Sequence, residues 1–299
     1  FLDATEYRKL LADNVKMPFI DEGYDTNWLD QISRAGLNIN HNINMKGGSA
    51  KSNYIANVNY GNQEGVFLGS YTKELRVSFD VNHYMFDDKL KFNLNVVRGT
   101  QQSGGFDTNV YRQALIRNPT ARPQDDNGDW TQTSRFQYSN PVASIYETER
   151  MNEADNTRLS AGLTLTLLPG WDTDLRLSSV KNSGLSGYYE TKKHYSNTVQ
   201  GKNGVASRSD SRSDLDILEF TSKYAKTFDK HNFSVLGGYS YQYNMSQGGY
   251  AYNYNFPTDA FSYNNLEEGQ ALLDGKAFMD SYKEDNKLIG FFGRGSYSF

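Results

Sequence analysis

In residues 159–180, hydrophobic and polar residues alternate along the chain with a period of two. In the stretch LSAGLTLTLL every second residue from Leu159 is apolar, and serine, glycine and threonine fill the positions between them. After a Pro-Gly pair the alternation resumes at Trp171. Because successive side chains of a β-strand point to opposite faces of a sheet, this stretch predicts two antiparallel strands joined by a tight turn.

The same period runs from Leu37 to the end of the chain and predicts nine strands. They are centred on residues 37–46, 54–60, 75–81, 90–96, 159–167, 171–178, 218–224, 233–243 and 287–299. Before Leu37 the pattern is helical. Asp3 is a suitable N-cap, and Glu6 stands three residues later, as in a capping box. Residues 25–34 predict a second helical turn.

The connections between these strands alternate between short and long. The short ones are 47–52, 86–89, 168–171 and 228–231, and the long ones are 61–70, 102–156, 181–214 and 245–286. Since sequential antiparallel strands place every second connection at the same end, one end of the sheet should carry tight turns. The other end should carry long loops rich in tyrosine, asparagine and serine.

Two all-β architectures fit an alternating pattern. A soluble β-sandwich buries the apolar face as its core, and alternation alone favours it because it is the commoner fold. Outer-membrane barrels have short turns on the periplasmic side and long loops outside, so the uneven connections favour a barrel. The runs also reach the roughly 9–11 residues that a tilted strand needs to cross a bilayer.

Composition agrees with a barrel and excludes several other classes. The chain has 299 residues, 37% of them hydrophobic, and a mean hydropathy of -0.72. Such polarity is expected where only half of each strand is apolar and the long loops lie in water. The net charge of -4 offers no basic field for nucleic acid, and with Cys 0 there is no disulfide or thiolate metal site. The first residues do not look like a signal peptide, so we expect a piece of a longer product.

The segment HNINMKGGSAKSNYIANVNYGNQEG carries a family resemblance. It is similar to the first barrel hairpins of SusC/RagA-type TonB-dependent outer-membrane transporters, which have an Asn-rich strand, Gly-Gly-Ser, a Lys-containing turn, Tyr and a closing Asn-Gln-Glu-Gly. The matching residues are His41, Gly47, Gly48, Ser49, Lys51, Tyr54, Tyr60, Asn62, Gln63, Glu64 and Gly65. TNWLDQISR resembles the preceding segment of the family, and ALIRNPTARPQDDNGDW and NPVA resemble parts of a long outer loop.

The resemblance implies a 22-stranded transmembrane barrel with an internal plug, in the outer membrane and crossing it many times. It also implies coupling to the TonB complex and a SusD-like lipoprotein lid. Residues 1–36 would be an outer loop with short helices, and residues 37–299 a partial barrel. Nine strands are an odd number, and open edges are not tolerated in lipid, so the chain should cover less than half of the barrel, without the plug.

No pattern in the sequence indicates catalysis, a cofactor or a metal. DDNGD, residues 125–129, resembles the start of a calcium loop, but Trp130 stands where glycine is required and Phe136 where the bidentate glutamate should be. A solvated Asn-Gly turn is therefore the default, and calcium stays open. The four histidines share no metal-ligand spacing, and G-x-S-x-G is absent.

The strongest binding candidate is the aromatic segment 248–265, GGYAYNYNFPTDAFSYNN. Flat rings alternating with amides suit sugars and peptides, although such a loop could equally pack on its neighbours or on the lid. The candidate substrate- or lid-contacting residues are Tyr250, Tyr252, Tyr254, Phe256, Tyr263 and Trp130. We expect active import of oligosaccharides or peptides. The alternative is a secreted β-sandwich that binds or cleaves glycans.

Overall fold

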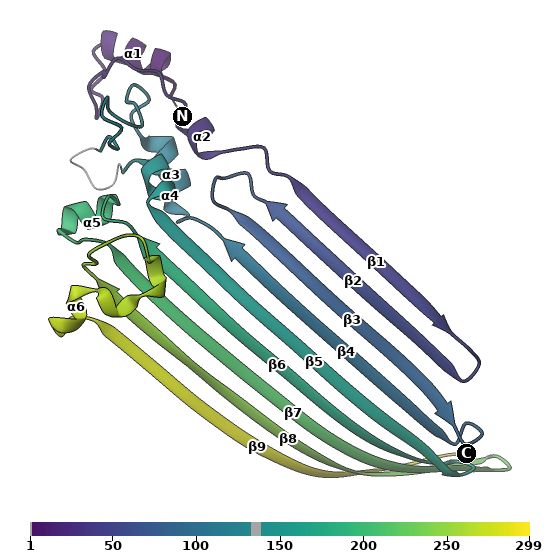
Figure 1. Cartoon of the computed structure of the whole chain (residues 1–299). Helices are drawn as coiled ribbons and strands as arrows, with labels where there is room; N and C mark the ends of the chain where they lie inside the picture. Colours follow the sequence, from purple (N-terminus) through teal and green to yellow (C-terminus); the bar gives the residue numbers. More distant parts are fainter. Residues whose placement is uncertain (1, 133–138) are drawn as a thin grey trace.

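The computed structural model describes residues 2–132 and 139–299, and its main feature is a single antiparallel sheet (Figure 1). The nine strands of this sheet are hydrogen-bonded in sequence order. They are β1 (Asn38–Gly48), β2 (Ser52–Glu64), β3 (Tyr71–Met85), β4 (Leu90–Gly104), β5 (Thr148–Leu168), β6 (Trp171–Glu190), β7 (Val205–Phe228), β8 (His231–Tyr254) and β9 (Phe278–Ser298). The strand number and the order expected from the period of two are confirmed.

Short helices gather at the end of the sheet that carries the long connections (Figure 1). They are α1 (Ala4–Ala12), α2 (Trp28–Ile32), α3 (Asn109–Ile116), α4 (Pro141–Tyr146), α5 (Tyr195–Gln200), α6 (Gln270–Leu273) and the 3₁₀ turns η2 (Ser262–Asn264) and η3 (Leu266–Glu268). The capping box of α1 is present, since the backbone N–H of Glu6 donates to Asp3 Oδ1 at 2.7 Å. Among the described residues, no helix has the length and apolarity to cross a membrane.

The tight turns lie where the sequence predicts them, but the long connections are shorter than predicted. Strands β7 and β8 each have 24 residues, and the connection expected at 181–214 shrinks to 191–204. The strands continue past their apolar stretches through segments made mostly of polar residues, such as VASRSDSRSD at the start of β7. These segments show no alternation of apolar and polar residues, so the sequence pattern does not reveal them as strand. The sheet therefore extends well beyond its apolar band, and residues 248–254 of the aromatic segment are strand rather than loop.

The apolar sets of neighbouring strands align in register and form one continuous apolar face. Phe92 pairs with Leu163, Leu163 with Leu175, and Leu175 with Phe220. Nothing in the described part of the chain covers this face, because Leu163 is 40% exposed, Leu165 39% and Phe220 42%. A core-forming face of a sandwich would be buried, so the leucines of LTLTLL do not pack against a second layer of this chain.

The opposite face is polar and is held by side-chain ladders between strands. Asn57 links three strands, because it accepts a hydrogen bond from Asn44 at 2.5 Å and donates to Ser78 at 3.3 Å. Thr164 donates to Asp174 at 2.6 Å farther along the sheet. Such cross-strand polar pairs stabilise a wet sheet surface by a few tenths to about 1 kcal/mol each.

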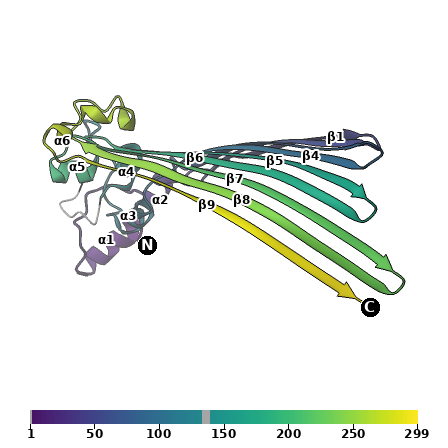
Figure 2. The ribbon, with the colours of Figure 1, turned by 90° about the horizontal axis from the view of Figure 1, so that it is seen from below.

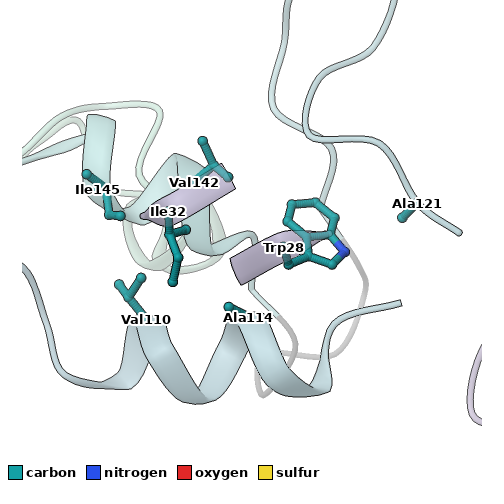
Figure 3. Close-up of a cluster of buried hydrophobic side chains, with 7 residues drawn as sticks. All are labelled: Trp28, Ile32, Val110, Ala114, Ala121, Val142 and Ile145. Carbon is teal, nitrogen blue, oxygen red and sulfur yellow. The ribbon is translucent and has the colours of Figure 1, made fainter. Parts of the chain in front are cut away.

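Two small loop bodies flank the long-connection end on opposite sides of the sheet, with α1 and α3 on one side and α6 on the other (Figure 2). The first is a cluster around Trp28 that ties α2 to α3 and α4 (Figure 3). Its buried members are Trp28, Ile32, Val110, Ala114, Ala121, Val142 and Ile145. The second is a smaller cluster of Tyr189, Ala206, Phe256 and Tyr263.

We expect the isolated chain not to form a monomeric barrel. In this sheet β1 and β9 pair on one side only, and every position of β9 except Gly290 is exposed. Open strand edges are tolerated neither in lipid nor in detergent and favour association. The chain refolded in detergent should give smeared or oligomeric bands without a compact, heat-modifiable species in unboiled gels. A discrete folded monomer would contradict this expectation.

Candidate functional site

The polar face continues past the apolar band and is hollowed at the long-connection end. One row of side chains crosses four strands there, because Arg150 pairs with Tyr188, Tyr188 with Ser207, and Ser207 with Tyr252. Two hollows adjoin this row, and Tyr188 lines both of them. This surface brings charged, aromatic and hydroxyl side chains together and is taken here as a candidate site.

The first hollow, called here the arginine hollow, has a volume of about 420 Å³. It is lined by Arg150, Asn152, Ser186, Gly187, Tyr188, Ser207, Ser209 and Tyr250. The Arg150 guanidinium lies 5.1 Å from the centre of the Tyr188 ring, within cation–π range. The hollow thus combines a cation, two aromatic rings and a floor of hydroxyls, and Arg150 itself is exposed.

The second hollow, called here the acidic hollow, has a volume of about 190 Å³ and lies between α3, α5 and the ends of β5 and β6. Its lining includes Asp107, Gln113, Tyr188, Glu190 and His194. Glu190 is the centre of a network, since it accepts from the Tyr188 hydroxyl at 2.5 Å and from another hydroxyl, that of Ser196 on α5, at 2.7 Å.

Electrostatics make this second hollow negative. Burial lowers the pKa of His194 below its ordinary value, against the opposing effect of Glu190, Glu147 and Asp107, so the imidazole is neutral at neutral pH. Burial and the hydrogen bond to Glu190 raise the pKa of Tyr188, which keeps the phenol protonated as a donor. Among the residues that the structure describes, no lysine or arginine lines the acidic hollow.

A third hollow of about 480 Å³ lies on the same face, nearer the apolar band. Its lining includes small residues that stand in register on three strands, Ala154, Gly184 and Ser211. Arg76 and Glu74 lie at one end of it. The polar face is therefore concave over a long stretch below the loop end.

The aromatic residues expected at the site lie on two different sides of the sheet. Tyr250, Tyr252 and Tyr254 alternate along β8 and share the polar face with Arg150. Tyr250 is 40% exposed and lines the arginine hollow. Lys202 covers the other two, lying 4.7 Å from the Tyr254 ring centre and 3.3 Å from the Tyr252 hydroxyl. Tyr250 is thus the most accessible of these three rings.

Phe256 and Tyr263 lie on the other side of the sheet and are buried. A Cβ atom on Gly187 would come within 2.4 Å of the Tyr263 ring, so this ring packs directly on glycine backbone. Trp130 is half-buried beside the Trp28 cluster, where its Nε1–H donates to Glu147 at 2.6 Å. These three residues are packed in the loop bodies.

Residues 125–129 form a compact turn, as the Asn-Gly pair predicts. Asp125 Oδ1 accepts the backbone N–H groups of Asn127 at 2.9 Å and Asp129 at 3.0 Å, and Gly128 has φ +82°. Phe136 lies outside the described residues. Within the described residues no cluster of three or more His, Cys, Asp or Glu side chains is arranged to hold a metal ion.

Two short helical pieces, η3 and α6, follow Asn265. Asn265 makes no side-chain cap to η3, and Gly269 separates η3 from α6. Gly275, at φ +68°, follows the end of α6.

Apart from Tyr250, the residues that line the acidic and arginine hollows were not singled out from the sequence. The sequence pattern assigns loops to the stretches that contain Arg150, Tyr188 and Glu190. The reason is that apolar residues no longer alternate with polar ones in these end portions of β5 and β6. Continuing the period of two through residues 148–156 and 182–190 would have placed all three on the polar face. Their juxtaposition with Asp107 and Gln113 depends on loop packing, which no pattern in the sequence reports.

The strands form a single antiparallel meander with an uncovered apolar band and a polar concave face. Tight turns lie at one end of the sheet and folded loops at the other. Together these features define the wall of a large outer-membrane-type β-barrel. Comparison with known proteins gives the type of barrel. The chain is 27% identical to TonB-dependent receptor P3 of Formosa agariphila, across the whole of this chain and 30% of that receptor. It is 30% identical to TonB-dependent receptor SusC of Bacteroides thetaiotaomicron, over 31% of this chain and 10% of that receptor.

Solved structures show the same fold. A structure of the RagAB peptide transporter matches 99% of this chain and 34% of that chain, with a TM-score of 0.75 and 16% identity. The RagAB peptide importer in a closed-closed state matches with a TM-score of 0.73, also at 16% identity. No family model matches the chain. The resemblance to SusC/RagA-type TonB-dependent transporters is confirmed, and the chain spans less than a third of the length of the curated relatives that it matches.

Proposed function

We propose that this chain forms part of the wall of an outer-membrane importer that takes up oligosaccharides or peptides with energy from the TonB complex. The observation that carries the proposal is the continuous apolar face, which is aligned in register and left uncovered. A face of this kind requires lipid or another apolar layer. The relatives are named as receptors and transport proteins rather than as enzymes.

In this proposal the tight turns face the periplasm and the helical loops face outward. The N-terminal residues up to 36 serve as an outer loop, and residues 37–299 as barrel wall. Substrate enters between the outer loops and a SusD-like lipoprotein lid, and it contacts the polar face. Tyr250 is the member of the expected aromatic set whose position best supports substrate contact, while Phe256, Tyr263 and Trp130 support the loops.

The rival proposal, a secreted β-sandwich that binds or cleaves glycans, requires a second layer over the apolar face. The described residues supply none, because their strands form one sheet and their loop bodies lie at its end. Extraction separates the two proposals, since only the sandwich would stay in solution without detergent.

Single cysteines in the full-length protein test the orientation. Cysteines at Asn127, Asn203 and Asn265, all in the outer connections, should react with a membrane-impermeant maleimide on intact cells. Cysteines at Asp88, Pro169 and Lys230, in the tight turns, should react only after lysis. The neighbouring Gly170 is avoided, because a Cβ atom added to Gly170 would lie 2.2 Å from the carbonyl oxygen of Ala225.

These 299 residues contain no cysteine, so this part of the protein adds no background labelling. Labelling of the turn set on intact cells would reverse the orientation. Equal labelling of both sets on intact cells would remove the membrane proposal altogether.

A further inference from the structure

A further hollow, of about 400 Å³, lies on the apolar side of the sheet, where the apolar face ends toward the long connections. It is called here the outward hollow. Two successive register rows form it, a lower row of Tyr60, Leu75, Thr100 and Asp155 and an upper row of Lys73, Gln102 and Glu153. Asp155 and Glu153 share the side of Leu163 and Leu165, because an even number of positions separates them along β5.

The lower edge of the outward hollow is continuous with the apolar face. Leu75 is followed on this side of β3 by Val77 and Phe79, and the three side chains are 43%, 42% and 38% exposed. Tyr60, which pairs with Leu75, is 40% exposed. A molecule bound here would place a polar group in the hollow and hydrocarbon over Val77 and Phe79. The shape and chemistry of this site therefore suit an amphiphile.

Lys73 supplies the outward hollow with a cation that no carboxylate neutralises. Its ammonium lies 5.5 Å from the centre of the Tyr71 ring and makes no ion pair within the described residues. Arg98, in the next row toward the apolar face, is already engaged, since it donates to Asp155 and to Thr157, each at 3.1 Å. An ammonium at the margin of an apolar surface is well placed to bind an anionic headgroup, and lysine is a frequent ligand of phosphate.

Two carboxylates limit the kind of headgroup that fits. Glu153 accepts from Gln102 at 3.3 Å and Asp155 accepts from Arg98, so each carboxylate keeps acceptor sites free. A headgroup that offered only phosphate oxygens would be repelled by both. Sugar hydroxyls donate to carboxylates, and the side chains of Thr100 and Gln102 offer further partners. The volume of about 400 Å³ is within the range of small-ligand sites, roughly 300–1,000 Å³.

We propose that the outward hollow binds the phosphorylated sugar headgroup of a glycolipid in the outer leaflet of the membrane. The phosphate lies at Lys73, sugar hydroxyls at Glu153 and Asp155, and the acyl chains run over the apolar face below Leu75. Asp155 stands 13 positions from Leu168 at the tight turn, and a tilted strand needs roughly 9–11 residues to cross the hydrocarbon. This level of the sheet is thus at the headgroups. The inference rests on the proposed function, which directs the long connections outward, and adds a lipid ligand to it.

Native mass spectrometry of the delipidated full-length protein tests the proposal with three detergent-solubilised probes: lipid A with both phosphates, lipid A without phosphates, and phosphatidylglycerol. Phosphorylated lipid A should bind about tenfold more tightly than either of the others, the usual effect of one hydrogen bond to a charged group. Lys73→Gln should weaken phosphorylated lipid A about tenfold and leave dephosphorylated lipid A unchanged, because both changes remove the same contact. Glu153→Ala should weaken both forms of lipid A by the same factor.

Lys91→Gln and Lys226→Gln are the matched controls. Lys91 also lies over an aromatic ring, 5.7 Å from the centre of that of Tyr84, but on the polar face of the sheet. Lys226 lies 4.6 Å from the centre of the Phe228 ring on the apolar side, at the tight-turn end, where the other leaflet would be. Neither variant should change the affinity for lipid A. Heat modifiability in unboiled gels shows that each variant keeps the barrel.

Four results would overturn the proposal. They are no binding of phosphorylated lipid A, equally tight binding of phosphatidylglycerol, a loss in Lys73→Gln that is as large for dephosphorylated lipid A, and a loss in Lys226→Gln as large as that in Lys73→Gln. Each of these leaves the import proposal intact. Failure of the import proposal shows instead in the cysteine labelling, which depends on no lipid ligand.

Discussion

Leu165→Arg is expected to reduce assembly of the full-length barrel sharply. Leu165 belongs to the apolar face, where it pairs with Leu90 and Thr173 and is 39% exposed. At the bilayer midplane an arginine on the lipid face of a barrel costs about 2–4 kcal/mol. Unfolding of the barrel in urea, or the yield of heat-modifiable protein in the outer membrane, measures the loss.

Thr164→Arg and Thr166→Arg are the matched controls on the neighbouring positions of β5. Both threonines face the polar side and donate to carboxylates, Thr164 to Asp174 at 2.6 Å and Thr166 to Asp172 at 2.7 Å. Either arginine loses one hydrogen bond, worth about 1 kcal/mol, but gains an aspartate as partner. Both variants should therefore assemble far better than Leu165→Arg.

Substituting aromatic side chains for Leu165 tests whether this position contacts lipid or a packed protein core. A close-packed core rejects a larger side chain at a cost of roughly 1–3 kcal/mol, whereas lipid has no fixed shape. Leu165→Trp and Leu165→Phe should assemble almost as the natural protein does, and Leu165→Asn should not. Equal damage from Trp and Asn would show that the leucines of β5 pack against protein, and the membrane proposal would fail with them.

The strands could be predicted because their signal is local. Alternation in β5 and β6 follows from the geometry of a single strand, and the tight turn between them is marked by Pro169 and Gly170. Strand ends were harder to predict, because β7 begins with serine, arginine and aspartate, whose alternation contains no hydrophobic contrast. Backbone pairing with β6 and β8 extends the strand there, and that pairing is a property of the sheet rather than of the segment.

The candidate site was predictable only in part, for a related reason. The sequence indicates that Tyr250, Tyr252 and Phe256 are close in the chain, but the strand ends between them, and Phe256 crosses to the other side of the sheet. Arg150 and Tyr188 lie 38 positions apart and meet through the register of β5 with β6. Gln113 reaches the acidic hollow only because α3 packs under α2 and α4, a contact between distant segments.

Trp28→Ala is expected to unfold the first loop body while the sheet persists. Trp28 is 1% exposed, its Nε1–H donates to the carbonyl oxygen of Asn118 at 2.8 Å, and the Arg117 guanidinium lies 5.4 Å from its ring centre. Burial lowers the pKa of Arg117 to about 10, so this side chain remains charged at neutral pH against the ring. Truncating a buried tryptophan costs about 3–5 kcal/mol, which is comparable with the whole stability of a small loop body.

Amide hydrogen exchange on the full-length protein measures this loss by segment. Protection should fall in α2, α3 and residues 117–121 and stay unchanged in β5 and β6. Ile20→Ala, at a side chain that is 78% exposed on the same N-terminal segment, is the matched control and should change stability by less than about 0.5 kcal/mol. Unchanged exchange in α3 would mean that contacts other than the Trp28 cluster hold this loop body on the sheet.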